Sequence, residues 1–497
     1  MQIALIFVML PFIVHSLGTR MYGFWALAGA FIGYFGLMDL GLATAVVRYV
    51  SRATGAGDNE EINQVASTSF FLFSGIGLIA LLVTAALAWS SYLFFKSPDE
   101  SRIFGQVIGI TGTGFALGFP MRVFAGLLEA RMRQDLQSMA SVLRLVLANI
   151  MIFVTLSSGH GILAVAASYL IADMLMHGLT AVMAYRILPD LQIRLSLISK
   201  DRLGQLFSYG GISFWSRLAG IFQFRTPPIL IAIYLNANYV TIFHIGARLL
   251  HIYAALIDSV ASLGGPMYSW QEARGDMEAL RRSFLNFVRI SGVLAVFVGA
   301  SIMFFGKNFV VAWMGADYVS SYMIIMIMGV PAIIAAAQGP AVNLLYSISR
   351  HRFLAVINTM ETVLGLLLSV LLLQFYGING VAAALGISIL LCKLIVLPMY
   401  TCKCVNIPKR DYLKALAIPN LKLLAPLFVW FLLVYPYLKP TYARLFAVAG
   451  LQIFIFIPVI YFFVLEPRDR TALAEAIKTR RIKKSVSPAP HASQTKN

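Results

Sequence analysis

Long apolar stretches recur along the whole chain, separated by short polar connections. A helix needs about 20 apolar residues to cross the roughly 30 Å hydrocarbon core of a bilayer, so each long stretch predicts a membrane-spanning helix. The predicted spans are residues 2–16, 22–48, 66–92, 103–128, 140–158, 161–184, 207–234, 239–264, 284–305, 319–347, 354–375, 378–401, 421–437 and 442–465. The pattern therefore predicts an all-α integral membrane protein with about fourteen transmembrane helices.

Composition agrees with this pattern. The 497 residues are 59% hydrophobic and 12% charged, with a mean hydropathy of +0.81, which is too apolar for a soluble protein of this length. The first apolar run has no basic segment before it and no small-residue cleavage site after it, so we predict no cleaved signal peptide. Because the chain starts inside its first span, the sequence leaves open whether its N-terminus is complete.

Basic residues in the connections predict the orientation of the chain. Connections after even-numbered spans contain Arg48, Arg52, Arg131, Arg133, Arg186, Arg194, Lys200, Arg202, Arg274, Arg281, Arg282, Arg289, Arg350, Arg352, Lys403, Lys409, Arg410 and Lys414, and the tail from Arg468 to Lys496 is basic as well. Connections after odd-numbered spans contain only Arg20, Lys96, Arg102, Lys307, Lys439 and Arg444. The positive-inside rule therefore predicts that both termini are cytoplasmic.

The same distribution explains the formal net charge of +18. In a soluble protein this charge would suggest a nucleic-acid partner, but here the basic residues would face anionic lipid headgroups. We therefore expect membrane lipids as partners and no nucleic acid. The tail at residues 466–497 is basic and ends in a polar, proline-containing stretch, which predicts a disordered cytoplasmic segment.

An internal repeat divides the predicted helices into two sets. Matching segments are Leu17-Gly18-x3-Tyr22 with Leu235-Asn236-x2-Tyr239, Gly36-Leu37-Met38-Asp39 with Ala255-Leu256-Ile257-Asp258, Gly57-Asp58 with Gly275-Asp276, and Pro120 with Pro340. The offset stays at about 219 residues, as expected for two related lobes. We predict an N-lobe at 1–206, a C-lobe at 207–420 and two appended helices at 421–465. Each lobe has six spans, so both cross the bilayer in the same direction.

Charged residues interrupt the seventh and eighth predicted spans. Arg217 and Arg225 lie in the seventh, and the eighth contains His244, Arg248, His251 and Asp258. Steps of four, three and seven residues place the latter four on one stripe of a helix. Charges in a membrane usually face a bundle interior or a hydrated cavity, and guanidinium binds phosphate well. The pattern predicts an anion site walled by these two helices.

Helix pairing is the alternative for several of these residues. Arg217 or Arg248 could form an ion pair with Asp39 or Asp258 and pin helices together. The two histidines could be satisfied interior residues. Asp39 and Asp258, which are equivalent in the repeat, could couple transport to an ion or stabilise helix ends near the cytoplasm.

No catalytic or metal-binding motif stands out. The sequence has no HExxH, GxSxG or Walker loop, and no long extracytoplasmic loop that could contain a glycosyl-transfer site. Cys402 and Cys404 have no second Cys or His pair at a useful spacing, so we interpret them and Cys392 as free thiols. We expect no enzymatic activity, no metal and no cofactor.

Two N-terminal motifs resemble a known family. Leu17-Gly18-x3-Tyr22-Gly23-x-Trp25, followed by Asp39-Leu40-Gly41-Leu42-x5-Arg48-Tyr49, is similar to the pattern of polysaccharide and O-antigen flippases. These belong to the multidrug/oligosaccharidyl-lipid/polysaccharide exporter superfamily. The number of helices, the loop lengths and the two-lobe repeat agree with this superfamily along nearly the whole chain.

The resemblance implies a central cationic cavity lined by helices 1, 2, 7 and 8. In the family this cavity alternates between inward- and outward-open states and binds the pyrophosphate and acidic sugars of an undecaprenyl-linked oligosaccharide. The family's cavity arginines carry over to Arg217, Arg225, Arg248 and Arg48. The first span departs from the family pattern because it has no charge between Gln2 and Val14, so the expected positive charge is concentrated on helices 7 and 8.

These observations lead to one hypothesis and two alternatives. The chain is expected to be a flippase for an anionic lipid-linked glycan in the bacterial inner membrane, with glycan polymerases as candidate partners. A cation-coupled multidrug exporter is the first alternative, but it would need acidic cavity residues. A membrane glycan polymerase or ligase is the second. The glycan, the coupling ion and the oligomeric state cannot be inferred from the sequence.

Overall fold

The computed structural model describes residues 2–95 and 97–464, and leaves undescribed the side chains of residues 2–4, 207–217 and 351. The predicted tail at 466–497 lies outside the described residues. Within these residues the chain is helical and forms no strand. The α-helices are α1 (Gln2–Leu17), α2 (Thr19–Tyr34), α3 (Leu42–Ala56), α4 (Asn59–Trp89), α5 (Pro98–Ala130), α6 (Gln134–Ser157), α7 (Ile162–Ile187), α8 (Lys200–Tyr234), α9 (Ala237–Ala261), α10 (Gly264–Ala273), α11 (Met277–Met314), α12 (Ser321–Ala337), α13 (Gly339–Ser347), α14 (His351–Ile389), α15 (Leu397–Cys404), α16 (Lys409–Val434) and α17 (Tyr442–Val459).

Short helical segments of other types join some of these helices. They are η1 (Phe35–Asp39), η2 (Ser90–Leu93), η3 (Leu195–Leu197), η4 (Ala316–Tyr318), η5 (Leu390–Val396), η6 (Tyr435–Tyr437) and η7 (Ile460–Val464). Segments η5 and η7 are π-helical, and the others are 3-10 helices.

The all-α membrane architecture predicted from the sequence is confirmed. In the described part of the chain, 11 helical segments are long and apolar enough to cross a membrane. Two shorter apolar helices, Leu5–Leu17 and Leu218–Tyr234, coincide with the first and seventh predicted spans. One segment, Arg352–Cys404, contains the eleventh and twelfth predicted spans, divided by the left-handed Gly377 at φ 56°. The number fourteen itself stays a prediction.

The second predicted span is wrong as a single helix. α2 ends at Tyr34, and the 3-10 helix η1 leads into the left-handed residues Leu40 and Gly41, whose φ angles are 48° and 75°. Glycine adopts this conformation at little cost because it has no Cβ atom. The apolar run continues across the turn, so hydrophobicity alone could not locate the break.

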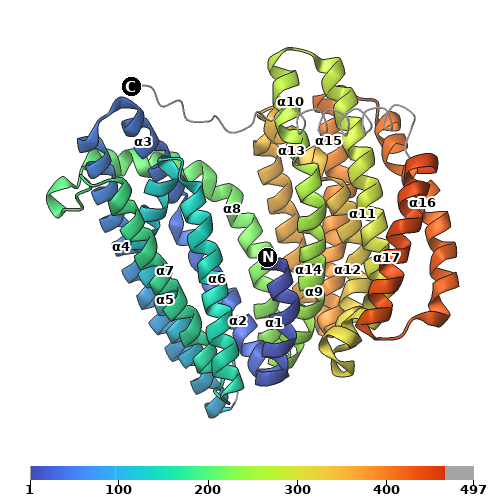
Figure 1. The fold of residues 1–497 in the computed structure, drawn as a ribbon, viewed down its shortest axis with the longest axis horizontal. Coiled ribbons are helices and arrows are strands. Elements are labelled where there is room, and N and C mark those ends of the chain that lie inside the picture. The colour runs from blue at the N-terminus through green and yellow to red at the C-terminus, as the bar shows by residue number, and fades with distance from the viewer. Residues whose placement is uncertain (1, 96, 465–497) are drawn as a thin grey trace, which may run out of the picture. The chain divides into compact units, whose positions relative to one another are not determined.

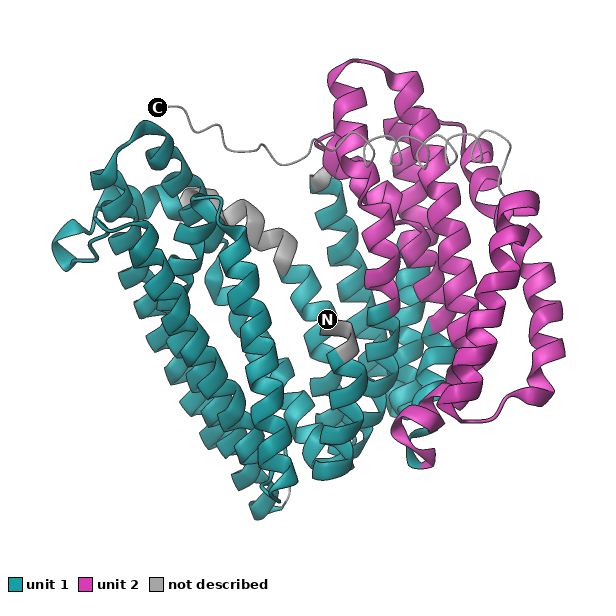
Figure 2. Cartoon of the chain, in the orientation of Figure 1, with its two compact units in different colours: residues 1–252, 317–328, 352–392 teal, residues 253–316, 329–351, 393–497 magenta. Residues whose placement is uncertain are grey.

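The chain divides into two compact units, coloured separately in Figure 2. Unit 1 comprises Met1–Ile252, Asp317–Met328 and Arg352–Cys392. Unit 2 comprises Tyr253–Ala316, Gly329–His351 and Lys393–Asn497. These units differ from the lobes at 1–206 and 207–420, because α8 and most of α9 group with the N-terminal helices. The lobe boundaries stay a prediction from the repeat.

Unit 1 is built on a bundle of α4, α5, α6 and α7, which lie side by side in Figure 1. Small residues let these helices approach closely. A Cβ atom on Gly77 of α4 would lie 2.6 Å from the carbonyl oxygen of Ala116 on α5. Such contacts are typical of helix packing in membranes, where small side chains allow van der Waals contact between backbones. The helices α2 and α3 pack against α5 of this bundle.

A second core in unit 1 joins α2 to α8 and α9. It includes Phe24, Ile231 and Val240, all fully buried. Gly23 lies against the backbone of Ala237, and the Thr241 hydroxyl donates to the Thr19 carbonyl over 2.7 Å. These contacts hold the start of α9 against α2, and they bring the charged stripe of α9 next to an aromatic helix.

Unit 2 contains α10, α11, α13, α15, α16 and α17. Polar contacts join its helices: the Tyr253 hydroxyl donates to the Ala295 carbonyl over 2.9 Å, and the Gln452 amide donates to the Ser301 hydroxyl over 2.6 Å. Large apolar side chains such as Phe454, at 77% exposure, cover its outer helices. This distribution is expected for helices that face lipid.

Candidate anion-binding site

The predicted stripe on the eighth span lies on one uninterrupted helix. α9 runs from Ala237 to Ala261 and includes His244, Arg248 and His251. His244 and Arg248 are half-buried, whereas His251 is exposed. All three belong to unit 1. Because they are spaced by four and three residues, their side chains leave the helix on the same face.

Arg225 on α8 joins this stripe. Its Nη1 donates to the Gly29 carbonyl of α2 over 3.4 Å, and its side chain lies directly over Gly33. The Arg225 and Arg248 charges are close enough to repel each other. Both also act on His244 and His251. We call Arg225, His244, Arg248 and His251 the basic cluster.

Within the part of the chain that the structure describes, neither Arg225 nor Arg248 forms a salt bridge with a carboxylate. Two guanidinium groups that repel each other and lack a counter-ion are unfavourable in a low-dielectric surrounding. A bound anion would relieve this repulsion, and a phosphate group would accept hydrogen bonds from both forks.

Aromatic residues hold the histidines of the basic cluster. The Tyr22 hydroxyl on α2 lies 3.0 Å from Nδ1 of His244, and Tyr22 is buried at 3% exposure. The ring of Phe224 on α8 meets the ring of His251 edge-on, with centroids 5.7 Å apart. These contacts fix one ring of the cluster to α2 and the other to α8.

α8 remains helical through Pro227 and Pro228 and ends at Tyr234. Proline removes a backbone donor, so the turn before it has carbonyl groups without their usual partners. The Thr226 hydroxyl donates to the Phe222 carbonyl over 2.7 Å and lies 2.5 Å from the Tyr34 hydroxyl. The carbonyls deprived of a donor by the two prolines are those of Gln223 and Phe224, so the Thr226 bond to Phe222 does not replace them, but the contact with Tyr34 connects α8 to α2 next to Arg225.

Asp39 and Asp258, which the repeat makes equivalent, have different surroundings. Asp39 is buried at 2% exposure and forms an ion pair with Arg122 of α5, with 3.4 Å between the charged atoms. Asp258 is exposed on α9 in unit 2, where it lies near Gly339 at the start of α13. Asp39 thus links η1 to α5, whereas Asp258 lies beside a helix N-terminus, which favours a negative charge.

Two further arginines that the sequence predicts for the anion site are not included in the basic cluster. Arg48 is exposed on α3, and its guanidinium carbon lies 5.9 Å from the centroid of the Tyr49 ring. The side chain of Arg217 lies outside the described residues. A role for either in anion binding stays a prediction.

The motif that carries the family resemblance also forms contacts that the sequence did not reveal. Tyr22 is hydrogen-bonded to His244, and Gly23 packs against Ala237. The ring of Trp25 stacks on that of Tyr169, with centroids 5.1 Å apart. The spacing of this motif could have indicated a helix face that contacts α7 and α9, but the partner residues come from distant parts of the sequence.

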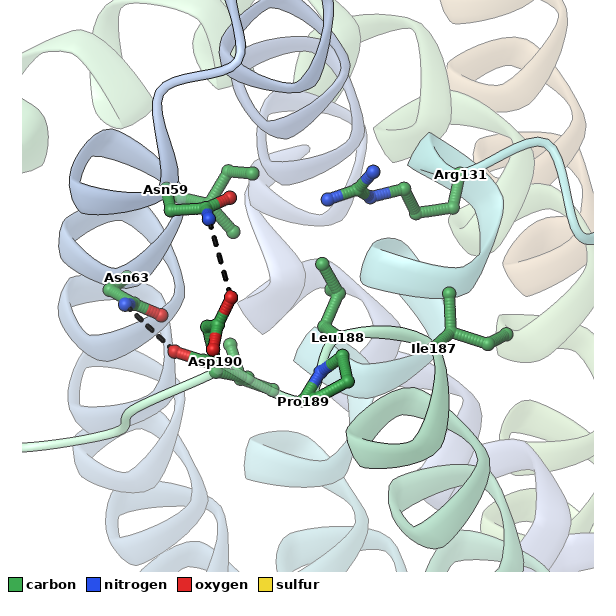
Figure 3. Close-up of a pocket in the computed structure, with 9 residues that line it drawn as sticks. Asn59, Asn63, Arg131, Ile187, Leu188, Pro189 and Asp190 are labelled. Carbon is green, nitrogen blue, oxygen red and sulfur yellow. Dashed lines mark hydrogen bonds between the residues drawn. The ribbon is translucent and has the colours of Figure 1, made fainter.

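A pocket in unit 1, which none of the predicted site residues lines, is shown in Figure 3. Asn63 of α4 donates to the Asp190 carbonyl over 3.1 Å and accepts from the Gln192 amide over 2.9 Å. Arg202 forms an ion pair with Glu61 over 2.6 Å. These contacts attach the connection between α7 and α8 to the start of α4, which gives the pocket a structural role.

Metal-ligating side chains do not gather in the described residues: no three of His, Cys, Asp and Glu come together in them. Cys392 and Cys402 are buried, and Cys404 is half-buried. The basic cluster supplies only donors and imidazole rings, a set suited to an anion and unsuited to a hard cation.

Comparison with known proteins identifies the family. A group of sequences described as "Polysaccharide biosynthesis protein" matches residues 17–323. The uncharacterized membrane protein EpsK of Bacillus subtilis is 24% identical over 449 residues, which cover 85% of this chain and 84% of EpsK. The probable low-salt glycan biosynthesis flippase Agl15 of Haloferax volcanii is 24% identical over 387 residues, which cover 77% of each chain.

Two solved structures have the same fold. The lipid II flippase MurJ in its inward closed conformation aligns with a TM-score of 0.70 at 14% identity, covering 92% of this chain and 97% of MurJ. An inward-facing multidrug resistance MATE family transporter of the MOP superfamily aligns with a TM-score of 0.70 at 17% identity, covering 80% and 93%. Since the matching sequence family spans more than half of the chain, the protein belongs to the polysaccharide biosynthesis protein family, and the resemblance inferred from its N-terminal motifs is confirmed.

Proposed function

We propose that this protein is a flippase that moves an anionic, undecaprenyl-pyrophosphate-linked oligosaccharide across the membrane. The observation that carries the proposal is the basic cluster, in which Arg225 and Arg248 come together in membrane-spanning helices without a salt bridge to a described carboxylate. Pyrophosphate offers the multiple oxygen acceptors that two guanidinium forks require.

The relatives support the lipid-linked nature of the substrate. Agl15 is named as a glycan biosynthesis flippase and MurJ as a lipid II flippase. A lipid-linked glycan has a hydrocarbon tail that stays in the bilayer, so only its polar head needs a hydrated path. Rocking between inward- and outward-open states around a fixed anion site would move that head across the membrane.

The chemistry of the basic cluster disfavours multidrug export, although a MATE transporter has the same fold. A cationic drug would need a carboxylate to balance its charge, whereas the cluster has two guanidinium groups. A glycan polymerase or ligase is the remaining alternative. Translocation needs no covalent step, and we assign none to the chain.

The proposal includes an orientation and a set of partners. The basic connections, such as the one at Arg131 and Arg133, would face the cytoplasm, with both termini on that side of a bacterial inner membrane. Membrane lipids and the lipid-linked glycan are required partners. A glycan polymerase that receives the translocated product is a further candidate, and co-purification from membranes would test it.

Reconstitution tests the proposed function. Liposomes with the purified protein would contain a fluorescent undecaprenyl-pyrophosphate-linked N-acetylglucosamine, and an impermeant quencher would report how much lipid reaches the outer leaflet. We expect wild-type protein to accelerate exchange and the Arg225→Ala/Arg248→Ala variant to fall to the rate of empty liposomes. Equal exchange by the two proteins would contradict the proposal. Product formation by the protein in detergent, without a bilayer, would favour the enzyme alternative.

A further inference from the structure

A second charged site lies halfway along α6 and α7 of unit 1. Nη1 of Arg144 donates to Oδ1 of Asp173 over 2.8 Å, and the side chains remain 43% and 32% exposed. Arg144 and Asp173 lie at least ten residues from either end of α6 (Gln134–Ser157) and α7 (Ile162–Ile187), so the pair is about 15–21 Å from the helix ends, within the hydrocarbon core. Exposed charges at that depth are costly if they face acyl chains.

The pair does not face lipid. Ala140 and Ala148, one turn before and after Arg144, are buried at 5% and 1% exposure. Phe153, on the opposite face of α6, is 53% exposed. On α7, Leu175 leaves the helix on the side opposite Asp173 and is also 53% exposed. The apolar faces meet the acyl chains, so the exposed part of the ion pair opens to a hydrated space.

The hydrogen-bonding capacity of this ion pair is only partly used. On the surface of the protein, Arg133 donates through both Nε and Nη2 to the two carboxylate oxygens of Asp135, each over 3.0 Å. Arg144 and Asp173 share one hydrogen bond. A low-dielectric surrounding would favour the two-pronged geometry even more strongly. Within the part of the chain that the structure describes, the remaining donors of Arg144 and the second carboxylate oxygen of Asp173 have no partner and are available to a polar ligand.

An aromatic pair lies beside these charges. Tyr169 precedes Asp173 by one turn of α7, and its ring stacks on that of Trp25 with an interplanar angle of 23°. Both residues are half-buried. Within the described residues, neither the Trp25 indole N–H nor the Tyr169 hydroxyl makes a hydrogen bond. Aromatic residues with a polar tip usually find a partner for it when they are buried, so this pair has unused donors as well.

The aromatic pair connects the Arg144–Asp173 site to the basic cluster. Tyr169 is within electrostatic reach of both Arg144 and Arg248. Tyr22, three residues before Trp25 on α2, is hydrogen-bonded to His244. A ligand that binds the basic cluster with one end could therefore meet the aromatic pair with the next part of its structure.

We propose that Trp25, Tyr169, Arg144 and Asp173 form a carbohydrate subsite that holds a sugar of the glycan while Arg225 and Arg248 hold the pyrophosphate. This inference rests on the proposed function. A sugar ring has an apolar C–H face, which packs on an aromatic ring, and hydroxyl groups around its edge, which both donate and accept hydrogen bonds. Asp173 offers an acceptor and Arg144 offers donors, and hydrogen bonds to charged groups are the strong ones.

Paired binding measurements test the subsite. Protein in lipid nanodiscs would be titrated with undecaprenyl pyrophosphate and with the same lipid carrying glucose, galactose, N-acetylglucosamine or N-acetylgalactosamine. The Arg144→Gln/Asp173→Asn variant removes both charges, keeps the shape of the Asp173 side chain and leaves no unpaired ion. Tyr169→Phe removes a single hydroxyl, a change small enough to test the subsite without disturbing the fold. Arg133→Gln/Asp135→Asn is the matched control, because it neutralises an ion pair on the surface.

We expect wild-type protein to prefer at least one glycosylated lipid over the bare lipid by about tenfold, or about 1.4 kcal/mol. The Arg144→Gln/Asp173→Asn variant should lose this preference, Tyr169→Phe should lose about half of it on a logarithmic scale, and the surface control should keep it. Equal losses for bare and glycosylated lipids would overturn the subsite. Wild-type binding without preference would also overturn it, while leaving the anion site intact. No binding of any of these lipids would overturn the proposed function itself.

Discussion

The guanidinium of Arg225 lies over Gly33, one turn beyond the carbonyl of Gly29 to which it donates. An ideal Cβ atom built on Gly33 would overlap the guanidinium and the end of the Arg225 side chain, whereas one built on Gly29 would meet nothing within 4 Å. The atoms that would have to move are the far end of a flexible side chain. Gly33 therefore positions Arg225 without being needed for the packing of two backbones.

Gly33→Ala should displace Arg225 and reduce transport with little effect on stability. The added methyl group forces the guanidinium away from the α2 backbone, so we expect translocation in liposomes to fall by about tenfold, or about 1.4 kcal/mol of activation free energy. Thermal unfolding in detergent should change little. Gly29→Ala is the matched control on the same helix and should keep wild-type transport. Equal effects of the two substitutions would contradict the positioning role of Gly33.

Arg248 should contribute to the affinity for undecaprenyl pyrophosphate mostly through the geometry of its guanidinium group. Arg248→Ala is expected to weaken binding of undecaprenyl pyrophosphate by about tenfold or more, and Arg248→Lys should recover only part of that loss, because ammonium keeps the charge but not the planar fork. Arg217→Ala is expected to abolish translocation, as the sequence predicts. Isothermal titration in nanodiscs and the liposome exchange assay measure these effects.

The binding and transport measurements are informative only if the Arg248 and Arg217 variants insert into the membrane and fold. Membrane fractionation and size-exclusion chromatography provide that check, and Arg133→Ala provides a control for the loss of a positive charge outside the basic cluster. Wild-type affinity of Arg248→Ala would exclude the basic cluster as the anion site.

Helix positions could be predicted from hydrophobicity because each span must bury its backbone polar groups in helical hydrogen bonds. The predicted span at 103–128 corresponds to α5 (Pro98–Ala130), and the one at 161–184 corresponds to α7 (Ile162–Ile187). The turn at Leu40 and Gly41 was missed, because an apolar run does not reveal a change of backbone direction. Hydropathy thus locates membrane segments but does not reveal helix breaks inside them.

The stripe of His244, Arg248 and His251 was predictable because its members lie on one helix with a fixed rotation per residue. The partners of these residues were not, since they come from helices far apart in the sequence. Tyr22 and His244 are separated by 222 positions. Nothing in the repeat indicated that Asp39 would be buried against Arg122 while Asp258 would be exposed. Symmetry in sequence predicts equivalent positions and does not predict equivalent neighbours.

Asp39 and Arg122 should stabilise the protein as a pair. Asp39→Asn leaves a partly buried arginine without its counter-charge, and breaking a buried pair in this way costs about 3–5 kcal/mol. The Asp39→Asn/Arg122→Gln variant has no unpaired charge, so it should be more stable than Asp39→Asn alone. Thermal unfolding in detergent compares them. If the double variant is destabilised by the sum of the losses measured for Asp39→Asn alone and Arg122→Gln alone, the ion pair does not stabilise the fold.

Single cysteines in the connections before and after α5 should report the orientation of the chain. Met132, 90% exposed between α5 and α6, follows an even-numbered predicted span, whereas Tyr92, 57% exposed in η2, is the last residue of an odd-numbered one. In a background with Cys392, Cys402 and Cys404 changed to Ser, we expect Tyr92→Cys to react with an impermeant maleimide in intact spheroplasts. Met132→Cys should react only after the membrane is permeabilised.

The two cysteine variants control for each other. Both should react equally with the maleimide once denatured, so a difference in labelling between them in spheroplasts must come from the side of the membrane on which each cysteine lies. The basic residues Arg131 and Arg133 next to Met132 are the physical reason for the expected cytoplasmic location, since basic connections are translocated poorly. Replacing both with Gln should therefore weaken the orientation signal without changing the helices. Labelling of Met132→Cys and protection of Tyr92→Cys in spheroplasts would reverse the proposed orientation. In that case the basic connections would lie outside, and the anion site would meet its substrate from the opposite leaflet.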